Sequence, residues 1–357
     1  MRRSSWLLSA ALLWLAGCAA HQPAAPPLPR IDASSFEPAV REAIERARAA
    51  AEAKPDEAAT VTSLGLTLHA HDQFAAAAQA YRRAAALDPA NSETLYLLGA
   101  ALTADGKYTE ALEPLQRVAA ALPKASAPRL KLADTMLAAG DSASARREYE
   151  TLVAADPSLA ATHYGLGRTL NGPSATAAFT RALTLFPRYG AAQFALANAY
   201  RRTGQNAEAE QLLKNYDRDK TITPPVDDPA LEKVYRLGVS STGLLRKAQI
   251  LEREGDVPAA LAVHEQVVRA NPKLDQAWVN LISLYARMQR PADAEQAFRR
   301  AIELAPSRAD AYYNFGVLCF GLERWADARA AFEKAHSLDP LNAEAAHNLG
   351  AAIERSG

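Results

Sequence analysis

Eight prolines recur along the 357-residue chain at a nearly constant spacing. They are Pro55, Pro89, Pro123, Pro157, Pro187, Pro272, Pro306 and Pro340. Successive prolines are separated by 34, 34, 34, 30, 85, 34 and 34 residues. A period of about 34 residues is typical of arrays of stacked helix–turn–helix units, in which a proline ends the second helix of each unit. The sequence therefore predicts an all-α solenoid of about eight helix pairs.

Side-chain size follows the same register. When Pro89 and each later proline of the series are placed at repeat position 32, with Thr221 at that position in the fifth unit, position 20 is alanine in all eight units. Position 8 is occupied by Gly65, Gly99, Ala133, Gly167, Ala197, Ala248, Ile282 and Gly316. Position 24 carries Tyr81, Leu115, Tyr149, Phe179, Leu213, His264, Phe298 and Phe332. Small residues allow the two helices of a pair to approach closely, and the larger residue fills the space beside them.

This pattern resembles that of the tetratricopeptide repeat (TPR) family over residues 58–216 and 241–357. The resemblance implies a right-handed superhelix of antiparallel helix pairs with a concave groove. Residues 35–53 predict a lone helix before the first pair, and residues 343–355 predict a first helix that lacks its partner. Unpaired helices with a polar outer face cap the two ends of a solenoid. We therefore expect about eight repeats with a capping helix at each terminus.

The 85-residue spacing indicates an insertion. Residues 217–240 predict a loop followed by a short helix, which Asp228 caps and Pro229 opens. This insertion divides the array into residues 35–216, with the N-terminal cap helix and repeats 1–5, and residues 241–357, with repeats 6–8 and the C-terminal cap helix. It either repacks inertly against its neighbours, forms a hinge or acts as a latch over the groove. The fourth unit is four residues short, and we expect Ser174 to cap its second helix.

The N-terminus predicts export. Two arginines precede a short apolar run, and residues 15–18 read Leu-Ala-Gly-Cys. Residues 1–17 are therefore predicted to be a signal peptide, and the motif resembles the bacterial lipoprotein cleavage box, which implies lipidation of Cys18. Ala19 follows the cysteine, and by the same resemblance favours the outer membrane, facing the periplasm. Proline-rich residues 18–34 predict an extended tether that holds the array within about 50 Å of the membrane. An ordinary secretory signal with a chance cysteine is the alternative.

The sequence contains no motif for catalysis, for phosphate binding or for a metal. We therefore expect no enzyme activity, no cofactor and no small-molecule substrate. Without the two signal arginines the chain carries about two more acidic than basic residues, which does not favour nucleic-acid binding. Cys319 lies at a position expected to face the helical core, where a free cysteine behaves as a small apolar residue.

Candidate binding residues lie on the first helix of each pair, which is expected to line the concave face. Asparagine recurs at position 6 of three successive units, and an amide can bind the backbone of an extended peptide. This series resembles the asparagine ladder in the TPR portion of O-linked N-acetylglucosamine transferases; asparagine is also common at this position in TPR proteins generally. Aromatic residues in the groove favour contact with a partner. The candidates are Asn280, Asn314, Asn348, Tyr313, Tyr96 and Phe194.

These observations predict a non-catalytic, membrane-anchored scaffold that binds protein or peptide partners in its concave groove, within a bacterial cell-envelope assembly. The alternative is a regulatory or accessory subunit that activates a periplasmic enzyme. The activity of such an enzyme, measured with and without the soluble array, distinguishes the two hypotheses.

Overall fold

The computed structural model describes residues 25–34, 36–220, 222–340 and 342–356, and these ranges contain nineteen α-helices and no β-strand. The helices before the insertion are α1 (Pro38–Ala53), α2 (Ala58–Ala70), α3 (Phe74–Leu87), α4 (Ser92–Ala104), α5 (Tyr108–Ala121), α6 (Ser126–Ala138), α7 (Ser142–Ala155), α8 (Ala160–Arg168), α9 (Gly172–Leu185), α10 (Gly190–Arg202) and α11 (Asn206–Asp219). Those that follow are α12 (Pro229–Arg236), α13 (Ser241–Glu254), α14 (Val257–Ala270), α15 (Asp275–Arg287), α16 (Pro291–Leu304), α17 (Ala309–Gly321), α18 (Trp325–Leu338) and α19 (Ala343–Ser356).

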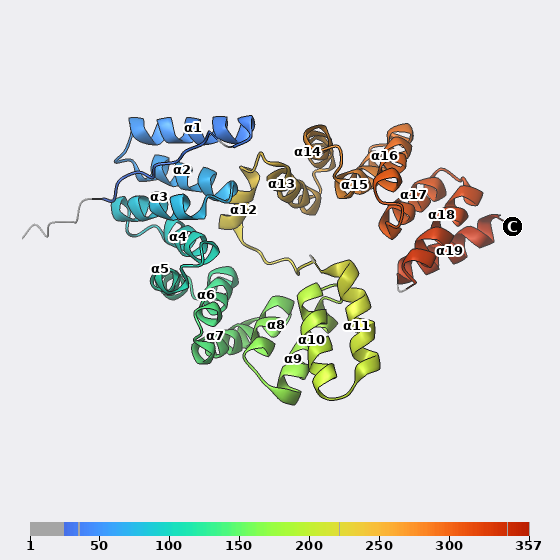
Figure 1. Cartoon of the computed structure of the whole chain (residues 1–357), viewed down its shortest axis with the longest axis horizontal. Helices are drawn as coiled ribbons and strands as arrows, with labels where there is room; N and C mark the ends of the chain where they lie inside the picture. The colour runs from blue at the N-terminus through green and yellow to red at the C-terminus, as the bar shows by residue number, and fades with distance from the viewer. Residues whose placement is uncertain (1–24, 35, 221, 341, 357) are drawn as a thin grey trace, which may run out of the picture.

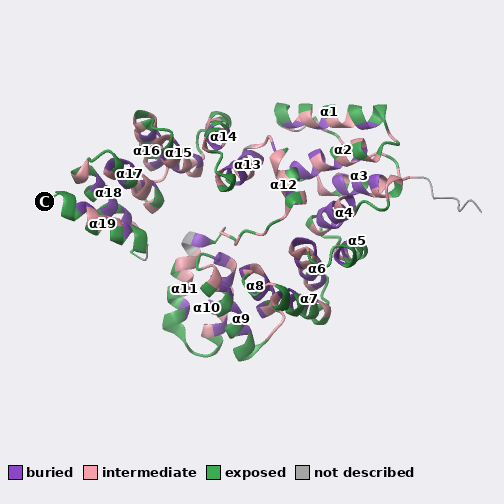
Figure 2. Cartoon of the chain, turned by 180° about the vertical axis from the view of Figure 1, so that it is seen from behind, coloured by how far each residue is buried: buried purple, intermediate pink, exposed green. Residues whose placement is uncertain are grey.

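Consecutive helices pack as pairs, from α2 with α3 to α17 with α18 (Figure 1). Each pair packs on the next within α2–α11 and within α13–α18, and the stack is interrupted between α11 and α13. Unpaired α1 and α19 lie at the two ends of the array. Figure 2 shows that the buried residues concentrate where neighbouring helices face one another. The predicted α-solenoid is therefore confirmed. The start of α4 follows a local rule, because the Asn91 side chain accepts a hydrogen bond from the Thr94 backbone N–H at 2.9 Å and caps the helix.

The crossing of each pair explains the small residue at position 8. A Cβ atom added to Gly65 would lie 2.6 Å from Cε1 of Tyr81, so the tyrosine ring occupies the space that a side chain would need. In the third repeat, Ala133 takes the place of glycine, and its partner Tyr149 instead approaches Gly165 of the next repeat. A Cβ added to Gly165 would lie 2.3 Å from Cε1 of Tyr149. Gly165, at position 6 of the fourth repeat, is thus required because the Tyr149 ring of the third repeat occupies the space of a side chain.

The shortened fourth repeat differs from the prediction. Helix α9 begins at Gly172, which has a left-handed φ of +57°, and Asn171 occupies the N-cap position. Ser174 lies inside the first turn of α9 and does not cap it, so the predicted cap was wrong. Glycine adopts a positive φ without steric cost, and proline is tolerated in the first turn. These two preferences allow the helix to start three residues earlier than a cap at Ser174 implies.

The expected free tether is also corrected over its described part. Residues 25–34 are not helical, and Leu28 and Ile31 pack against the core of the first repeats. The Arg83 guanidinium donates a hydrogen bond to the Pro26 carbonyl oxygen at 2.7 Å. This part of the chain is therefore attached to the array. Cys18 and the predicted signal peptide lie outside the described residues. Within those residues, no helix has the length and apolar character needed to cross a bilayer.

The insertion forms α12, as predicted, and the Asp228 side chain caps it by accepting a hydrogen bond from the Leu231 N–H at 3.0 Å. From α11 the chain runs back across the molecule, so that α12 packs against α2 and α4 as well as α13 (Figure 1). Leu231 and Val234 of α12 belong to the hydrophobic core of the first repeats, whereas a separate core begins at Leu244 in α13. Helix α12 therefore belongs, by its packing, to the N-terminal half of the chain.

Candidate functional site

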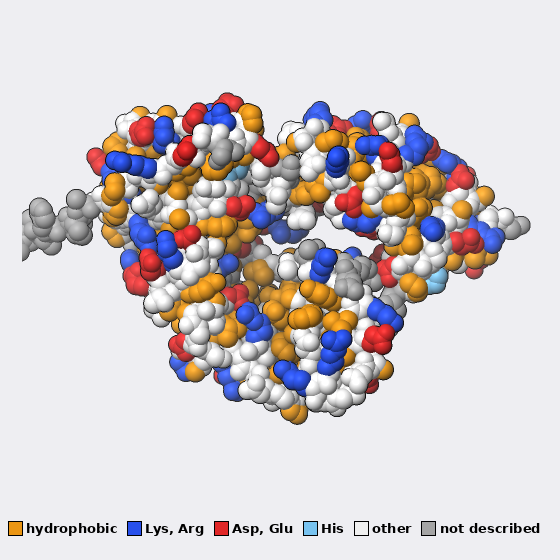
Figure 3. Space-filling model, in the orientation of Figure 1, with side chains coloured by type: hydrophobic (Ala, Val, Ile, Leu, Met, Phe, Trp, Pro, Cys, Tyr) orange, Lys and Arg blue, Asp and Glu red, His pale blue; other side chains and the backbone are white. Residues whose placement is uncertain are grey.

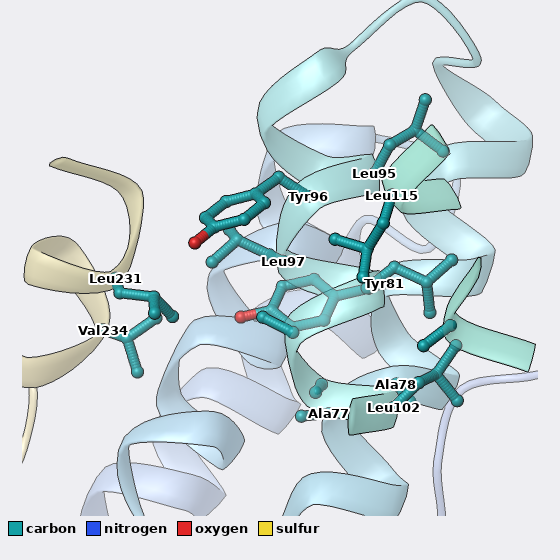
Figure 4. Close-up of a cluster of buried hydrophobic side chains, with 14 of the residues drawn as sticks. Ala77, Ala78, Tyr81, Leu95, Tyr96, Leu97, Leu102, Leu115, Leu231 and Val234 are labelled. Carbon is teal, nitrogen blue, oxygen red and sulfur yellow. The ribbon is translucent and has the colours of Figure 1, made fainter. Parts of the chain in front are cut away.

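The insertion covers the part of the concave face formed by α2 and α4. The hydroxyl of Tyr96, on α4, donates a hydrogen bond to Asp228, and Tyr96 is only 3% exposed. Figure 4 shows Leu231 and Val234 of α12 directed towards Tyr96 and Leu97. Tyr96 faces the groove as its repeat position implies, but α12 occupies the space in front of it. The prediction that Tyr96 contacts a partner therefore requires α12 to leave.

A cavity of about 650 Å3 lies beside α12, between α6, the end of the loop before α12, and α13. Its lining includes side chains of both charge signs, hydroxyl and amide groups and prolines. Six of the lining residues are Lys131, Asp134, Tyr189, Pro225, Arg246 and Gln249. The space-filling view shows that the molecule is hollowed between the α8–α11 part and the α13–α16 part (Figure 3). The groove of the N-terminal half is therefore only partly filled by the insertion.

The three asparagines lie on the first helices of successive repeats, α15, α17 and α19. Two of them donate a hydrogen bond to the first helix of the preceding repeat. The Asn314 amide nitrogen donates to the Val279 carbonyl oxygen at 3.3 Å, and the Asn348 amide nitrogen donates to the Tyr313 hydroxyl at 3.3 Å. The amide oxygen of Asn280 accepts at 2.8 Å from the glutamine four residues earlier. An amide nitrogen has two N–H groups, so each asparagine retains a donor for another molecule. The series thus joins neighbouring repeats and also presents polar groups on one face.

Tyr313 and Val317 lie one helical turn apart on α17, on the face that also carries Asn314. Tyr313 is half-buried and its hydroxyl donates to Glu344 at 3.2 Å, whereas Val317 is 45% exposed. Val317 was not identified from the sequence as a candidate binding residue. Its position three residues after Asn314 places both on one face of the helix and could have indicated it. We call Asn280, Asn314, Asn348, Tyr313 and Val317 the C-terminal groove.

Phe194 lies away from the C-terminal groove, on α10. Its side chain is 46% exposed, and its ring centroid lies 5.1 Å from that of Tyr216 on α11. The predicted aromatic residues therefore do not form one site. The structure brings Tyr313 together with the asparagines, covers Tyr96 with α12 and leaves Phe194 on the surface of the fifth repeat.

Three residues with potentially reactive side chains, Cys319, His69 and His264, are buried in the core. Burial raises the pKa of the Cys319 thiol to about 11, and burial lowers the pKa of His69 to about 4. His264, expected to fill space in the core, is fully buried, and its Nε2 lies 2.6 Å from a carboxylate oxygen of Glu252. No cluster of three or more potential metal ligands occurs among the described residues. Cys319, His69 and His264 are therefore core residues and do not contribute to an exposed site.

Comparisons with solved structures find similar helical arrays over part of the chain. A crystal structure of MamA protein is 20% identical and covers 47% of this chain and 97% of its own, with a TM-score of 0.41. A MamA RS-1 double mutant is 20% identical, with coverages of 46% and 94% and a TM-score of 0.42. The first TPR of Spaghetti (RPAP3), bound to an HSP90 peptide, is 25% identical, with coverages of 32% and 90% and a TM-score of 0.31. No curated protein matches the chain.

Three family models, each described as tetratricopeptide repeat, match the sequence. They match residues 62–126, residues 102–166 with 172–221, and residues 273–340. Together these ranges cover more than half of the chain. The matched ranges contain most of the helix pairs whose register the prolines mark, and they leave out α1, α12, α13, α14 and α19. The chain belongs to the tetratricopeptide repeat family.

Proposed function

We propose that this protein is a non-catalytic scaffold that holds a protein or peptide partner in the C-terminal groove. One observation carries the proposal: α15, α17 and α19 present asparagine amides around an exposed apolar side chain, Val317, and no other described segment covers them. In the N-terminal half, by contrast, α12 covers the equivalent face of α2 and α4. Stacked repeats provide extended concave surfaces of this kind for binding.

The chemistry of the groove suits an extended chain. The remaining amide donors of Asn314 and Asn348 are positioned to bind backbone carbonyls, which every peptide carries irrespective of its side chains. Val317 offers an apolar contact between them. Because the groove contains few deeply buried contacts, the affinity for one peptide is modest, and several contacts or a membrane anchor raise it by increasing the local concentration.

Crosslinking in cells, followed by mass spectrometry, tests this function. Val317→Asp places a charge in the groove and should abolish recovery of the partner. Leu122→Asp is the matched control, because Leu122 is 44% exposed, close to the 45% of Val317, but lies after α5 in the other half of the chain. Equal partner recovery by the two variants, with unchanged circular dichroism, would refute binding in this groove.

The proposed setting is the bacterial cell envelope, with the chain anchored through lipid on Cys18 in the outer membrane and facing the periplasm. The lipoprotein-like motif before Cys18 and Ala19 after it support this location. Because residues 25–34 pack on the array, only residues 19–24 separate it from the lipidated cysteine, and six residues span at most about 22 Å. The array would therefore lie close to the membrane. Cys18→Ser should release the protein from membranes, and continued retention would contradict the anchor.

A further inference from the structure

The segment of residues 222–236, which we call the resident segment, lies on the concave face of the N-terminal half in the manner of a bound peptide. It consists of an extended stretch, 222–228, followed by α12. The Asp228 carboxylate makes two contacts at the junction: it caps α12 through the Leu231 N–H, and it accepts a hydrogen bond from Tyr96 of the groove. One acidic side chain thus both starts the helix and joins it to α4.

Two apolar side chains anchor the helix. Leu231 and Val234 are three residues apart and therefore lie on one face of α12, where both are buried against the core of the first repeats (Figure 4). At the edge, the Lys233 ammonium group pairs with the Glu93 carboxylate of α4 at 2.7 Å. An amphipathic helix that places its apolar face in a groove is a recurring mode of peptide recognition.

Several features distinguish the resident segment from a repeat helix. Helix α12 has eight residues, and non-helical stretches connect it to α11 and to α13. A helix of this length is not stable by itself in water and depends on its contacts with the groove. The cavity of about 650 Å3 runs along its side, with Lys131 and Tyr189 in its lining, so a second chain has space to enter beside the segment.

We propose that the concave face of α2, α4 and α6 is a second binding surface, and that the resident segment occupies it until a partner segment of the same chemistry displaces it. That partner segment is a short helix capped by an acidic residue, with two apolar side chains three residues apart, preceded by an extended stretch that contains proline. This surface is separate from the C-terminal groove and goes beyond the proposed function.

Binding of a fluorescein-labelled synthetic peptide with the sequence of residues 222–238 tests the proposal by fluorescence anisotropy, with the full chain purified in detergent. In the wild type, the resident segment competes at an effective concentration in the millimolar range, so the peptide binds weakly. The double variant Leu231→Asp with Val234→Asp disables the resident segment and should bind the peptide roughly tenfold or more tightly. Leu237→Asp is the control, because Leu237 is exposed at the end of α12, and it should behave as the wild type.

The specificity of the surface is tested by changing either the peptide or the protein. A peptide with Asp228→Ala, or addition of Tyr96→Phe to the double variant, should weaken binding. If the double variant keeps its helical circular dichroism but does not bind the peptide, the proposal is overturned. If that variant loses its fold, hydrogen exchange of the wild type decides: amides of α12 must exchange faster than those of α4, and equal rates overturn it. No outside partner is used, so failure here leaves the C-terminal groove unaffected.

Discussion

The hydrogen bond between Tyr96 and Asp228 should control how often α12 opens, and Tyr96→Phe removes it with little change in shape. Burial and the neighbouring carboxylate raise the pKa of Tyr96, so its hydroxyl remains a protonated donor at all working pH values. A hydrogen bond to a charged group contributes about 1.5–3 kcal/mol. Asp228 is half-buried, and water partly replaces the lost donor, so about 1–2 kcal/mol is the expected loss. That loss corresponds to a roughly five- to thirtyfold increase in opening of α12.

Native-state hydrogen exchange with mass spectrometry measures this opening on peptides that cover α12. The matched control is Tyr285→Phe, which removes a hydroxyl-to-carboxylate hydrogen bond to Glu265, 3.0 Å long, in the other half of the chain. We expect faster exchange in α12 for Tyr96→Phe alone, while the unfolding temperature of the whole array changes little. Unchanged α12 exchange in Tyr96→Phe, or the same increase in both variants, would refute the assignment of this bond as the main polar contact of α12.

Three further predictions concern the core. Because the folded chain lowers the pKa of His69 from 6.5 to about 4, the unfolded chain binds the proton more readily between these values. Stability should therefore fall by up to about 3 kcal/mol as pH drops from 6.5 to 4, and His69→Gln should remove this part of the pH dependence in denaturant titrations. A Cβ added at Gly316 would lie 2.7 Å from the Phe332 ring, so Gly316→Ala should lower the free energy of unfolding by about 1–3 kcal/mol. Gly350→Ala, whose added atom meets nothing within 4 Å, should raise it by about 0.5–1 kcal/mol; equal effects on thermal unfolding would contradict the packing argument. With a pKa of about 11, the Cys319 thiol should react with a disulfide reagent only on unfolding, in a variant where it is the sole cysteine, and rapid native labelling would contradict its burial.

Much of the fold followed from the sequence because its determinants are local or periodic. The prolines end helices within their own repeat, and Asp228 caps α12 through an N–H three residues away. The pairing of positions 8 and 24 repeats along the chain, so a contact such as that of Gly65 with Tyr81 was expected from its register. Repetition turns one local rule into a prediction for the whole array.

The candidate site was less predictable because its contacts join residues that are distant in sequence. Tyr96 and Asp228 are 132 residues apart, and nothing in the repeat pattern pairs them. The packing of residues 25–34 depends likewise on Arg83, more than 50 residues later. The predicted cap at Ser174 was wrong for a different reason. Helix α9 already begins at Gly172, which has a positive φ, so Ser174 lies inside its first turn.

The arrangement of the two halves depends mainly on the position of α12. Its apolar residues, Leu231 and Val234, join the N-terminal core, while its contacts with α13 include two ion pairs, Arg236 with Glu254 and Glu232 with Arg253. Exposed and half-exposed ion pairs of this kind contribute little to stability. The buried apolar side chains therefore hold α12 to the N-terminal half far more firmly than these ion pairs hold it to α13. Displacement of α12 from its groove would therefore leave the ion pair of Arg246 with Asp72, 3.7 Å long and exposed, as a direct contact of α13 with the first repeats.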